Sequence, residues 1–349
     1  MTMRILEKHS VPAWLEGLQT TRRIVGPKPS NGHAAFGEIT TAAELALDYG
    51  TTILPPKKAL LPTEEELLRF DRGRPQAPSD AMATVLLGVH TCDLHAIRLL
   101  DRVYEMGVRD QAYARRREAT VLVGLECLRP CSQHAFCKSM GTLTPPDGID
   151  LHLIDMGESY AVEVGTDAGA ALLKGVDGVR EAGEADLKRL DRVMSEKWAR
   201  FPYPLEFDIS QLPSLLTMGH TSDLWNELAE RCLSCGSCTV VCPTCTCFDV
   251  RDDIDLSLSS GARTRIWDSC QLASFAVVAG GHNFRKARAA RVRHRFLRKG
   301  KFQVEAFGLP GCVGCGRCAQ ACIAKITPID TYNGLFHRQQ ETVRPEVTS

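Results

Sequence analysis

Residues 232–243 read C-L-S-C-G-S-C-T-V-V-C-P, and residues 312–322 read C-V-G-C-G-R-C-A-Q-A-C. Both stretches have the cysteine spacing C-x2-C-x2-C-x3-C, which is typical of bacterial ferredoxin sequences that bind 4Fe–4S clusters. Gly236, Gly314 and Gly316 suit such loops, because the backbone must pass close to inorganic sulfide. Two copies in one chain argue against zinc and against chance. The sequence therefore predicts two 4Fe–4S clusters and an electron-transfer protein.

The two cysteine runs are expected to exchange their last ligands. In each run, three closely spaced cysteines can bind three irons of one cube, and the fourth, about one helical turn further on, usually binds the other cluster. The first cluster is then assigned to Cys232, Cys235, Cys238 and Cys322. The second cluster is assigned to Cys312, Cys315, Cys318 and Cys242.

The composition is that of an ordinary globular protein. The chain has 349 residues, enough for two domains, and it is 44% hydrophobic and 24% charged. Its 42 basic and 42 acidic residues cancel, so its net charge gives no reason to expect nucleic-acid binding. The N-terminus lacks a signal-peptide core, and no apolar run is long enough to span a membrane. Fifteen cysteines without an export signal predict a cytoplasmic protein whose thiols are free to bind metal.

The first two hundred residues have the pattern of an α/β domain. Residues 83–89 and 120–125 are apolar runs typical of buried strands, and apolar residues between 94 and 103 recur at helical spacing. Strand, helix and strand predict a parallel crossover unit, in which the carboxyl ends of the strands are the usual ligand-binding edge.

Four further cysteines fall at that edge. Cys92 follows the first predicted strand, Cys127 follows the second, and Cys131 and Cys137 lie in the loop after it. They predict a third 4Fe–4S cluster, and the alternative is that some of them are simply small buried residues. His134 lies among them and is expected to be a loop residue rather than a ligand.

Other local patterns complete the predicted fold. Thr63 and Glu66 have the spacing of a capping box and predict the start of a helix, and residues 74–78 resemble a Pro-rich linker. Residues 151–154 and 160–164 are predicted to form a short hairpin or edge strands, and residues 185–199 and 222–231 are predicted to form amphipathic helices. We expect an N-terminal α/β domain (1–203), a mainly helical dicluster ferredoxin-like domain with a long insert between its cluster motifs (204–335), and a C-terminal tail (336–349).

The insert contains two features whose roles stay open. Cys245, Cys247 and Cys270 are expected to pack beside the first cluster, and the alternatives are another metal site or a redox-active thiol pair. Residues 285–301 are strongly basic. They predict a solvated amphipathic helix or a docking surface for an acidic partner, and nucleic-acid binding is the weakest interpretation because no known motif occurs.

Several segments together resemble a known family. They read ILPPKK (53–58), GVHTCDLHAIRLLDRVY (88–104), ARRRE (114–118), CPTCTCFDV (242–250), WDSCQ (267–271) and VAGGHNFR (278–285). This pattern, over roughly residues 50–330, resembles the beta subunit of cytoplasmic NiFe hydrogenases of the sulfhydrogenase (sulfur reductase) type. The corresponding iron–sulfur subunit of anaerobic sulfite reductase shares much of it, and ILPPKK and WDSCQ look closer to the hydrogenase branch.

The resemblance implies a subunit that carries electrons and performs no bond chemistry of its own. Its implied partners are a flavin subunit that binds NAD(P) and the small and large hydrogenase subunits, or else the subunits of a sulfite reductase. Both ferredoxin runs and Cys92, Cys127 and Cys137 match cysteines of the family pattern. The family's Cys-Phe-Cys segment reads Ala135-Phe136-Cys137 here, so one thiol is missing and Cys131 is the candidate replacement.

Two cofactors are expected on other subunits. No strand–Gly-x-Gly-x-x-Gly–helix segment occurs, so no flavin is predicted on this chain. The nickel site of a hydrogenase needs two cysteine pairs, the second near the C-terminus. The residues after Cys322 contain no cysteine, so that second pair is missing here. We therefore predict no catalytic residue in this chain.

Overall fold

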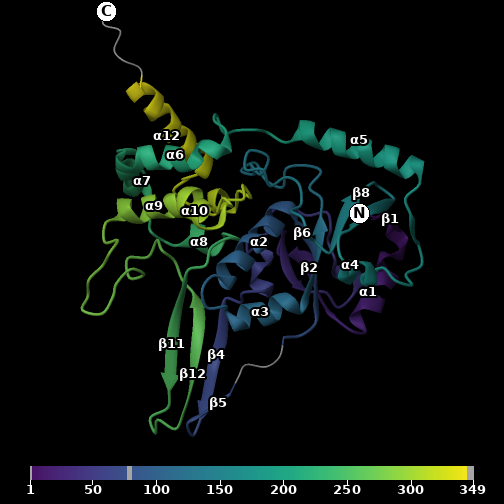
Figure 1. The fold of residues 1–349 in the computed structure, drawn as a ribbon, viewed down its shortest axis with the longest axis horizontal. Helices are drawn as coiled ribbons and strands as arrows, with labels where there is room; N and C mark the ends of the chain where they lie inside the picture. The colour runs from purple at the N-terminus through teal and green to yellow at the C-terminus, as the bar shows by residue number, and fades with distance from the viewer. Residues whose placement is uncertain (1, 77–80, 344–349) are drawn as a thin grey trace, which may run out of the picture.

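The computed structural model describes residues 2–76 and 81–343, and Figure 1 shows two sheets and a group of helices. The larger sheet has eight strands in the order β10-β1-β9-β8-β7-β6-β2-β3. Its strands are β1 (Thr2–Glu7), β2 (Arg23–Ser30), β3 (His33–Glu38), β6 (Thr84–His90), β7 (Thr120–Leu125), β8 (Leu151–Asp155), β9 (Ser159–Val164) and β10 (Val179–Glu181). β2, β6, β7 and β8 form its parallel centre, and the other pairs are antiparallel.

The helices surround this sheet and form the second half of the molecule. The α-helices are α1 (Val11–Gln19), α2 (Thr91–Glu105), α3 (Gln111–Glu118), α4 (Asp167–Leu172), α5 (Glu184–Arg200), α6 (Leu212–Met218), α7 (Leu224–Arg231), α8 (Ser237–Val240), α9 (Arg288–Leu297), α10 (Gln303–Phe307), α11 (Arg317–Gln320) and α12 (Pro328–Val343). A π-helical segment, Arg298–Phe302, joins α9 to α10. Short 3-10 turns occur at Lys8–Ser10, Ala42–Glu44, Pro56–Ala59, Ile209–Gln211 and Gly219–Thr221. No helix among the described residues has both the length and the apolar character needed to cross a bilayer.

The predicted crossover unit lies at the centre of the larger sheet. β6 and β7 pair in parallel, from Thr84 opposite Thr120 to His90 opposite Leu125, and α2 and α3 connect them. Every residue of both strands is buried, as expected for parallel strands covered on both faces. The predicted pairing of the two short strands is also confirmed, because β8 and β9 are antiparallel neighbours.

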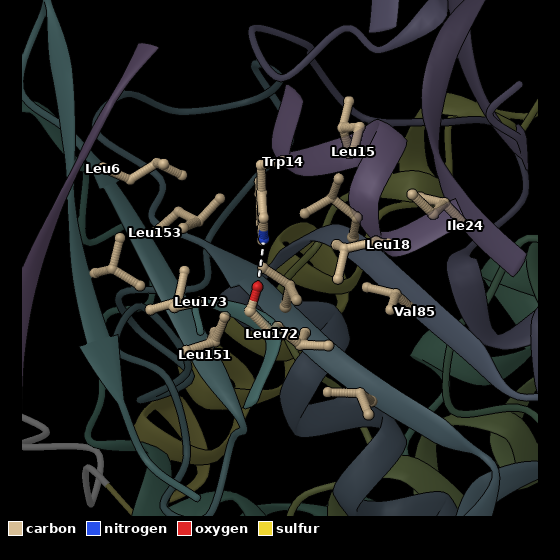
Figure 2. Close-up of a cluster of buried hydrophobic side chains, with 14 of the residues drawn as sticks. Leu6, Trp14, Leu15, Leu18, Ile24, Val85, Leu151, Leu153, Leu172 and Leu173 are labelled. Carbon is tan, nitrogen blue, oxygen red and sulfur yellow. Dashed lines mark hydrogen bonds between the residues drawn. The ribbon is translucent and has the colours of Figure 1, made fainter. Parts of the chain in front are cut away.

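Alternate side chains of the central strands enter two different cores. Val85 belongs to the core that α1 and α4 cover, and Figure 2 shows this core around Trp14. The Trp14 indole donates a hydrogen bond of 2.7 Å to the Leu172 carbonyl and so ties α1 to α4. Leu86, on the opposite face of β6, packs with residues of α2 and α3. The sheet is therefore the middle of three layers.

A second, four-stranded sheet combines two distant parts of the chain. Its strands are antiparallel, in the order β11-β12-β4-β5. They are β4 (Glu64–Asp71), β5 (Arg74–Gln76), β11 (Phe248–Ile254) and β12 (Ser260–Trp267). β12, from the insert between the cluster motifs, pairs with β4, and the two hairpins form the arm at the bottom of Figure 1.

The helix predicted from the capping box after Thr63 is wrong, because these residues form β4. The backbone of β4 pairs with β12, and the buried Glu65 carboxylate forms ion pairs with Arg116 and Arg265. These long-range contacts override a capping preference of about 1 kcal/mol. The predicted linker at 74–78 is also partly wrong, because its first three residues form β5; residues 77 and 78 lie outside the described residues.

The helical half packs around its own core, which includes Trp225, Phe296 and Tyr332. Phe136 and Met140, from the N-terminal cysteine loop, belong to the same core. Both sides of the expected boundary at 203/204 thus share one core, and the division into domains stays a prediction. α5 and α7 confirm the two predicted amphipathic helices. Residues 336–343, expected to be a tail, continue α12, where Gln339 donates a hydrogen bond to the Leu215 carbonyl.

Candidate iron–sulfur centres

The first cavity is walled by the four cysteines assigned to the first cluster, three from one run and the last from the other, which we call the first crossed set. Its thiols are those of Cys232, Cys235, Cys238 and Cys322. The loop turns at Gly236, which has a φ of +80° and lies just before α8. Backbone N–H groups point toward sulfur, from Ser234 to Cys232 Sγ and from Ile326 to Cys322 Sγ, both at 3.4 Å. Such N–H groups stabilise negative charge on a ligand sulfur and help to set a cluster's potential.

The second cavity is walled by the second crossed set. Its thiols are those of Cys242, Cys312, Cys315 and Cys318. Phe136, Phe296 and Tyr332 line the same cavity and make it apolar. Gly316, with a φ of +74°, lies just before α11 as Gly236 does before α8. The repeated cysteine spacing therefore folds into two copies of one local structure.

The donor set fits cubane clusters better than single metal ions. Each cavity has four thiols around a central space, and a 4Fe–4S cluster needs this arrangement because four Cys thiolates hold it. A structural zinc ion would need its ligands to converge on one point at about 2.0–2.3 Å. Among the described residues, no three His, Cys, Asp or Glu side chains converge in that way.

The basic stretch of the insert forms the amphipathic helix α9 and the π-helical segment after it, and one of its faces is turned inward. Arg291, Arg295 and Lys299 recur at every fourth residue, and this face points toward the cysteines instead of toward solvent or a partner. Arg291 is buried and donates hydrogen bonds to the Gln271 carbonyl at 3.0 Å and to Ser234 Oγ at 3.2 Å. Three cations beside the cysteines can balance the negative charge of two clusters. The regular spacing of these basic residues was the signal for this role.

Nearby thiols affect the acid–base properties of these cations. Burial alone would lower the pKa of the Arg295 guanidinium, but Cys238 and Cys318 raise it well above its ordinary value. The Lys299 ammonium is buried and donates hydrogen bonds to the Thr244 carbonyl at 2.9 Å and to Thr244 Oγ1 at 2.7 Å. Both groups therefore keep their positive charge close to sulfur.

The four N-terminal cysteines also come together. Cys92, at the start of α2, and Cys127, after β7, lie in one buried cluster with Cys137. The Cys131 thiol accepts a hydrogen bond of 3.1 Å from Thr51 and interacts electrostatically with each of the other three. The His134 ring lies 3.4 Å from the Gln133 amide nitrogen, which fits the predicted loop residue.

A cavity of about 580 Å³ opens beside this third site. Cys127 and Cys131 form part of its wall, together with Tyr49 and His90, whose rings stack with centroids 4.1 Å apart. Glu126 also belongs to this wall, and its buried carboxylate lies 2.7 Å from the ammonium of Lys197, a residue of α5 that is also buried. Sequence reasoning missed this ion pair, because the two residues are far apart in the chain and each resembles a surface charge.

The third site packs directly against the loop of the second cavity. The Phe136 N–H donates a hydrogen bond of 2.7 Å to the Gly314 carbonyl, and Thr142 Oγ1 donates one of 2.7 Å to the Val313 carbonyl. Cys315 lies in the same buried cluster as Cys92. The two sets of cysteines are therefore neighbours.

A buried ion pair joins the same two loops. The Arg317 guanidinium, between Cys315 and Cys318, donates two hydrogen bonds to the Asp93 carboxylate at 2.6 and 2.7 Å. It also donates to the Thr52 carbonyl at 2.9 Å and to Thr52 Oγ1 at 3.1 Å. Asp93 directly follows Cys92, so this bidentate contact fixes one candidate ligand set relative to the other.

Comparisons with known proteins cover the dicluster region and the chain as a whole. A family model described as a 4Fe–4S dicluster domain matches residues 231–326, which include both ferredoxin runs. Sulfhydrogenase 2 subunit beta of Pyrococcus furiosus is 36% identical over 327 residues, and the match covers 93% of this chain and 96% of that protein. No solved structure matches the chain. The similarity thus extends through the N-terminal α/β region as well as the dicluster region.

Proposed function

The chain belongs to the family of sulfhydrogenase beta subunits, and on that basis we propose that it relays single electrons through three 4Fe–4S clusters. It is an iron–sulfur electron-transfer subunit of an oxidoreductase complex. The first and second clusters would be held by the two crossed sets of cysteines, and the third by Cys92, Cys127, Cys131 and Cys137.

The observation that carries this proposal is the order of the three sites. The thiols of Cys238 and Cys318, one from each ferredoxin run, interact electrostatically. Cys315, another thiol of the second set, shares a buried cluster with Cys92 of the third. The second set therefore lies between the other two, which supports a linear path for electrons.

The proposed partners are a flavin subunit that binds NAD(P) and the small and large subunits of a NiFe hydrogenase. A bound 4Fe–4S cluster supplies one-electron chemistry, whereas nicotinamide nucleotides exchange hydride, so a flavin is needed between them. The match to a sulfhydrogenase subunit favours this assembly over a sulfite reductase. In this chain, the cysteines would hold the clusters, and the loop glycines would let the backbone pass close to inorganic sulfide. The buried cations would balance the negative charge of the clusters.

Substitution of single cysteines tests the crossed assignment. We expect Cys235→Ala and Cys322→Ala to remove the same low-temperature spin signal and about four irons per chain, because both thiols wall the first cavity. Cys242→Ala is the matched comparison and should remove the other dicluster signal, because its thiol walls the second cavity. The measurements are iron counting and spin spectroscopy on the anaerobically purified complex. If Cys322→Ala and Cys242→Ala exchanged their effects, the runs would not be crossed.

The third cluster has its own test in Cys131→Ala. The expected change is from about twelve irons per chain to about eight, because a cube loses a ligand. The distinct signal of that cluster should disappear, while both dicluster signals persist. His134→Ala, in the same loop, is the control and should retain all the iron. Full iron content in Cys131→Ala would show that this thiol is not the fourth ligand.

A further inference from the structure

Three cysteines that belong to none of these sets lie in a row beside Cys242. The Cys247 thiol interacts electrostatically with those of Cys245 and Cys270. Cys245 interacts in the same way with Cys242. Four sulfur atoms therefore follow one another, from a candidate ligand of the second cluster to Cys270. The sequence alone leaves the roles of these three cysteines open.

The β11–β12 hairpin brings this row together. Phe248 pairs with Trp267 at its base, and the Asp268 N–H donates a hydrogen bond of 3.0 Å to the Cys247 carbonyl. Cys247 thus lies just before β11, and Cys270 lies just after β12. Lys57 fixes the neighbouring turn, because its ammonium donates a hydrogen bond of 2.8 Å to the Cys245 carbonyl.

The surroundings of these thiols differ from those of cysteines that only fill space. Cys245 and Cys270 are buried, but they belong to none of the hydrophobic clusters found among the described residues. Their neighbours are other thiols, the Lys299 ammonium, and the Gln271 amide, which donates to Cys270 Sγ at 3.6 Å. Packing against hydrocarbon therefore does not account for them.

The arrangement of sulfur atoms favours a sulfur–sulfur bond over a metal ion. Within the described parts of the chain, no three such side chains converge on a common point. Thiols in a row instead form adjacent pairs, and two adjacent thiols can be oxidised to a disulfide. Cys245 and Cys247 are separated by one residue, so a disulfide between them would close a very small ring. Cys247 and Cys270, in contrast, flank the two outer ends of the β11–β12 hairpin at its base.

We propose that Cys247 and Cys270 form a dithiol–disulfide couple that exchanges two electrons with the neighbouring clusters. This inference rests on the proposed electron-transfer function. In reduction the S–S bond breaks, each sulfur gains one electron and one proton, and two thiols result. The clusters supply the electrons one at a time and solvent supplies the protons. Cys247 is only half-buried, so it gives solvent access to the pair.

The position of the couple suits this exchange. Cys238, in the first cavity, interacts electrostatically with Cys270 and Cys245. Cys242, in the second cavity, interacts electrostatically with Cys245. The row therefore lies beside candidate ligands of both clusters, and it can store a pair of electrons that would otherwise need two clusters. This places a two-electron centre on a chain that is otherwise a one-electron relay.

Differential alkylation of the whole complex tests the couple. Anaerobic samples are either mildly oxidised or reduced with dithionite, quenched in acid, alkylated and analysed by peptide mass spectrometry. We expect a Cys247–Cys270 disulfide in the oxidised sample and two alkylated thiols in the reduced one. Equal alkylation of both residues in the two samples would overturn the proposal, even if every cluster signal is normal. Missing cluster signals in the unmodified complex would instead contradict the proposed function.

Two variants sharpen this test. Cys270→Ser should abolish the disulfide, leave the iron content unchanged and lower the number of electrons taken up in a reductive titration by about two. Cys245→Ser is the matched control and should retain the disulfide and the full electron uptake. Loss of about four irons in Cys270→Ser would identify this residue as a cluster ligand and overturn the couple.

Discussion

Gly316→Ala is expected to prevent stable assembly of the second and third clusters. Gly316 has a φ of +74°, and a Cβ placed there would lie 2.6 Å from the carbonyl carbon and oxygen of His134. Left-handed backbone costs alanine about 1–2 kcal/mol, and the forced separation of two backbones adds roughly 1–3 kcal/mol. The loops that carry Cys315 and Cys137 would have to move apart. Iron counting should show a loss of up to about eight irons per chain.

Gly308→Ala provides the matched control. Gly308 also has a positive φ, +66°, but a Cβ there would meet nothing within 4 Å. It should therefore cost only the backbone strain of about 1–2 kcal/mol and leave the iron content unchanged. Thermal unfolding of the anaerobic holoprotein compares the two variants directly. Similar destabilisation and equal iron content in both would contradict a tight contact between the two cysteine loops.

Arg317→Met is expected to destabilise the protein by about 3–5 kcal/mol, because it leaves the Asp93 carboxylate buried without its partner. The two side chains are only 2% and 1% exposed, and their contact is bidentate. The same substitution frees the second cluster's loop from α2, so the signal of the third cluster should broaden or disappear. Denaturant unfolding and spin spectroscopy on the anaerobic complex measure these two effects.

Two further variants isolate the contribution of the buried charge. Arg263 forms an equally bidentate pair with Asp252, with two contacts of 2.7 Å, but both side chains are exposed. Arg263→Met should therefore change stability very little. The double variant Arg317→Met/Asp93→Leu should recover most of the stability, because apolar replacement of a buried pair is often neutral. A double variant as unstable as Arg317→Met would mean that the cost comes from lost packing.

The parts of the fold that the sequence predicted well depend on neighbours in the chain. β6 and β7 are continuous apolar runs, so their burial and parallel pairing followed from composition and from the helix between them. That pairing also brought Cys92 and Cys127 to one edge, since each follows one of these strands. The missing thiol at Ala135 left the fourth ligand open, and the structure places Cys131 beside the other three.

What the sequence did not reveal concerns residues whose partners are far away. Glu65 was assigned to a helix because its immediate neighbours suit a helix start, but Arg265, two hundred positions later, pairs with it in a sheet. The basic stretch forms the expected amphipathic helix, but charge alone does not reveal what the inward face of that helix covers. Its inward face became evident only from the contacts of Arg291 and Lys299.

The chemistry of the protein was determined by the sequence itself, because a ferredoxin loop is short and its ligand spacing is fixed within a dozen residues. The relative placement of the three sites was decided only by the tertiary structure. It depends on glycine loops that stack backbone on backbone, on the Arg317–Asp93 contact, and on a hairpin that returns Cys270 to Cys247. These contacts join residues distant in the chain, and their energies come from burial and charge pairing that no local pattern contains.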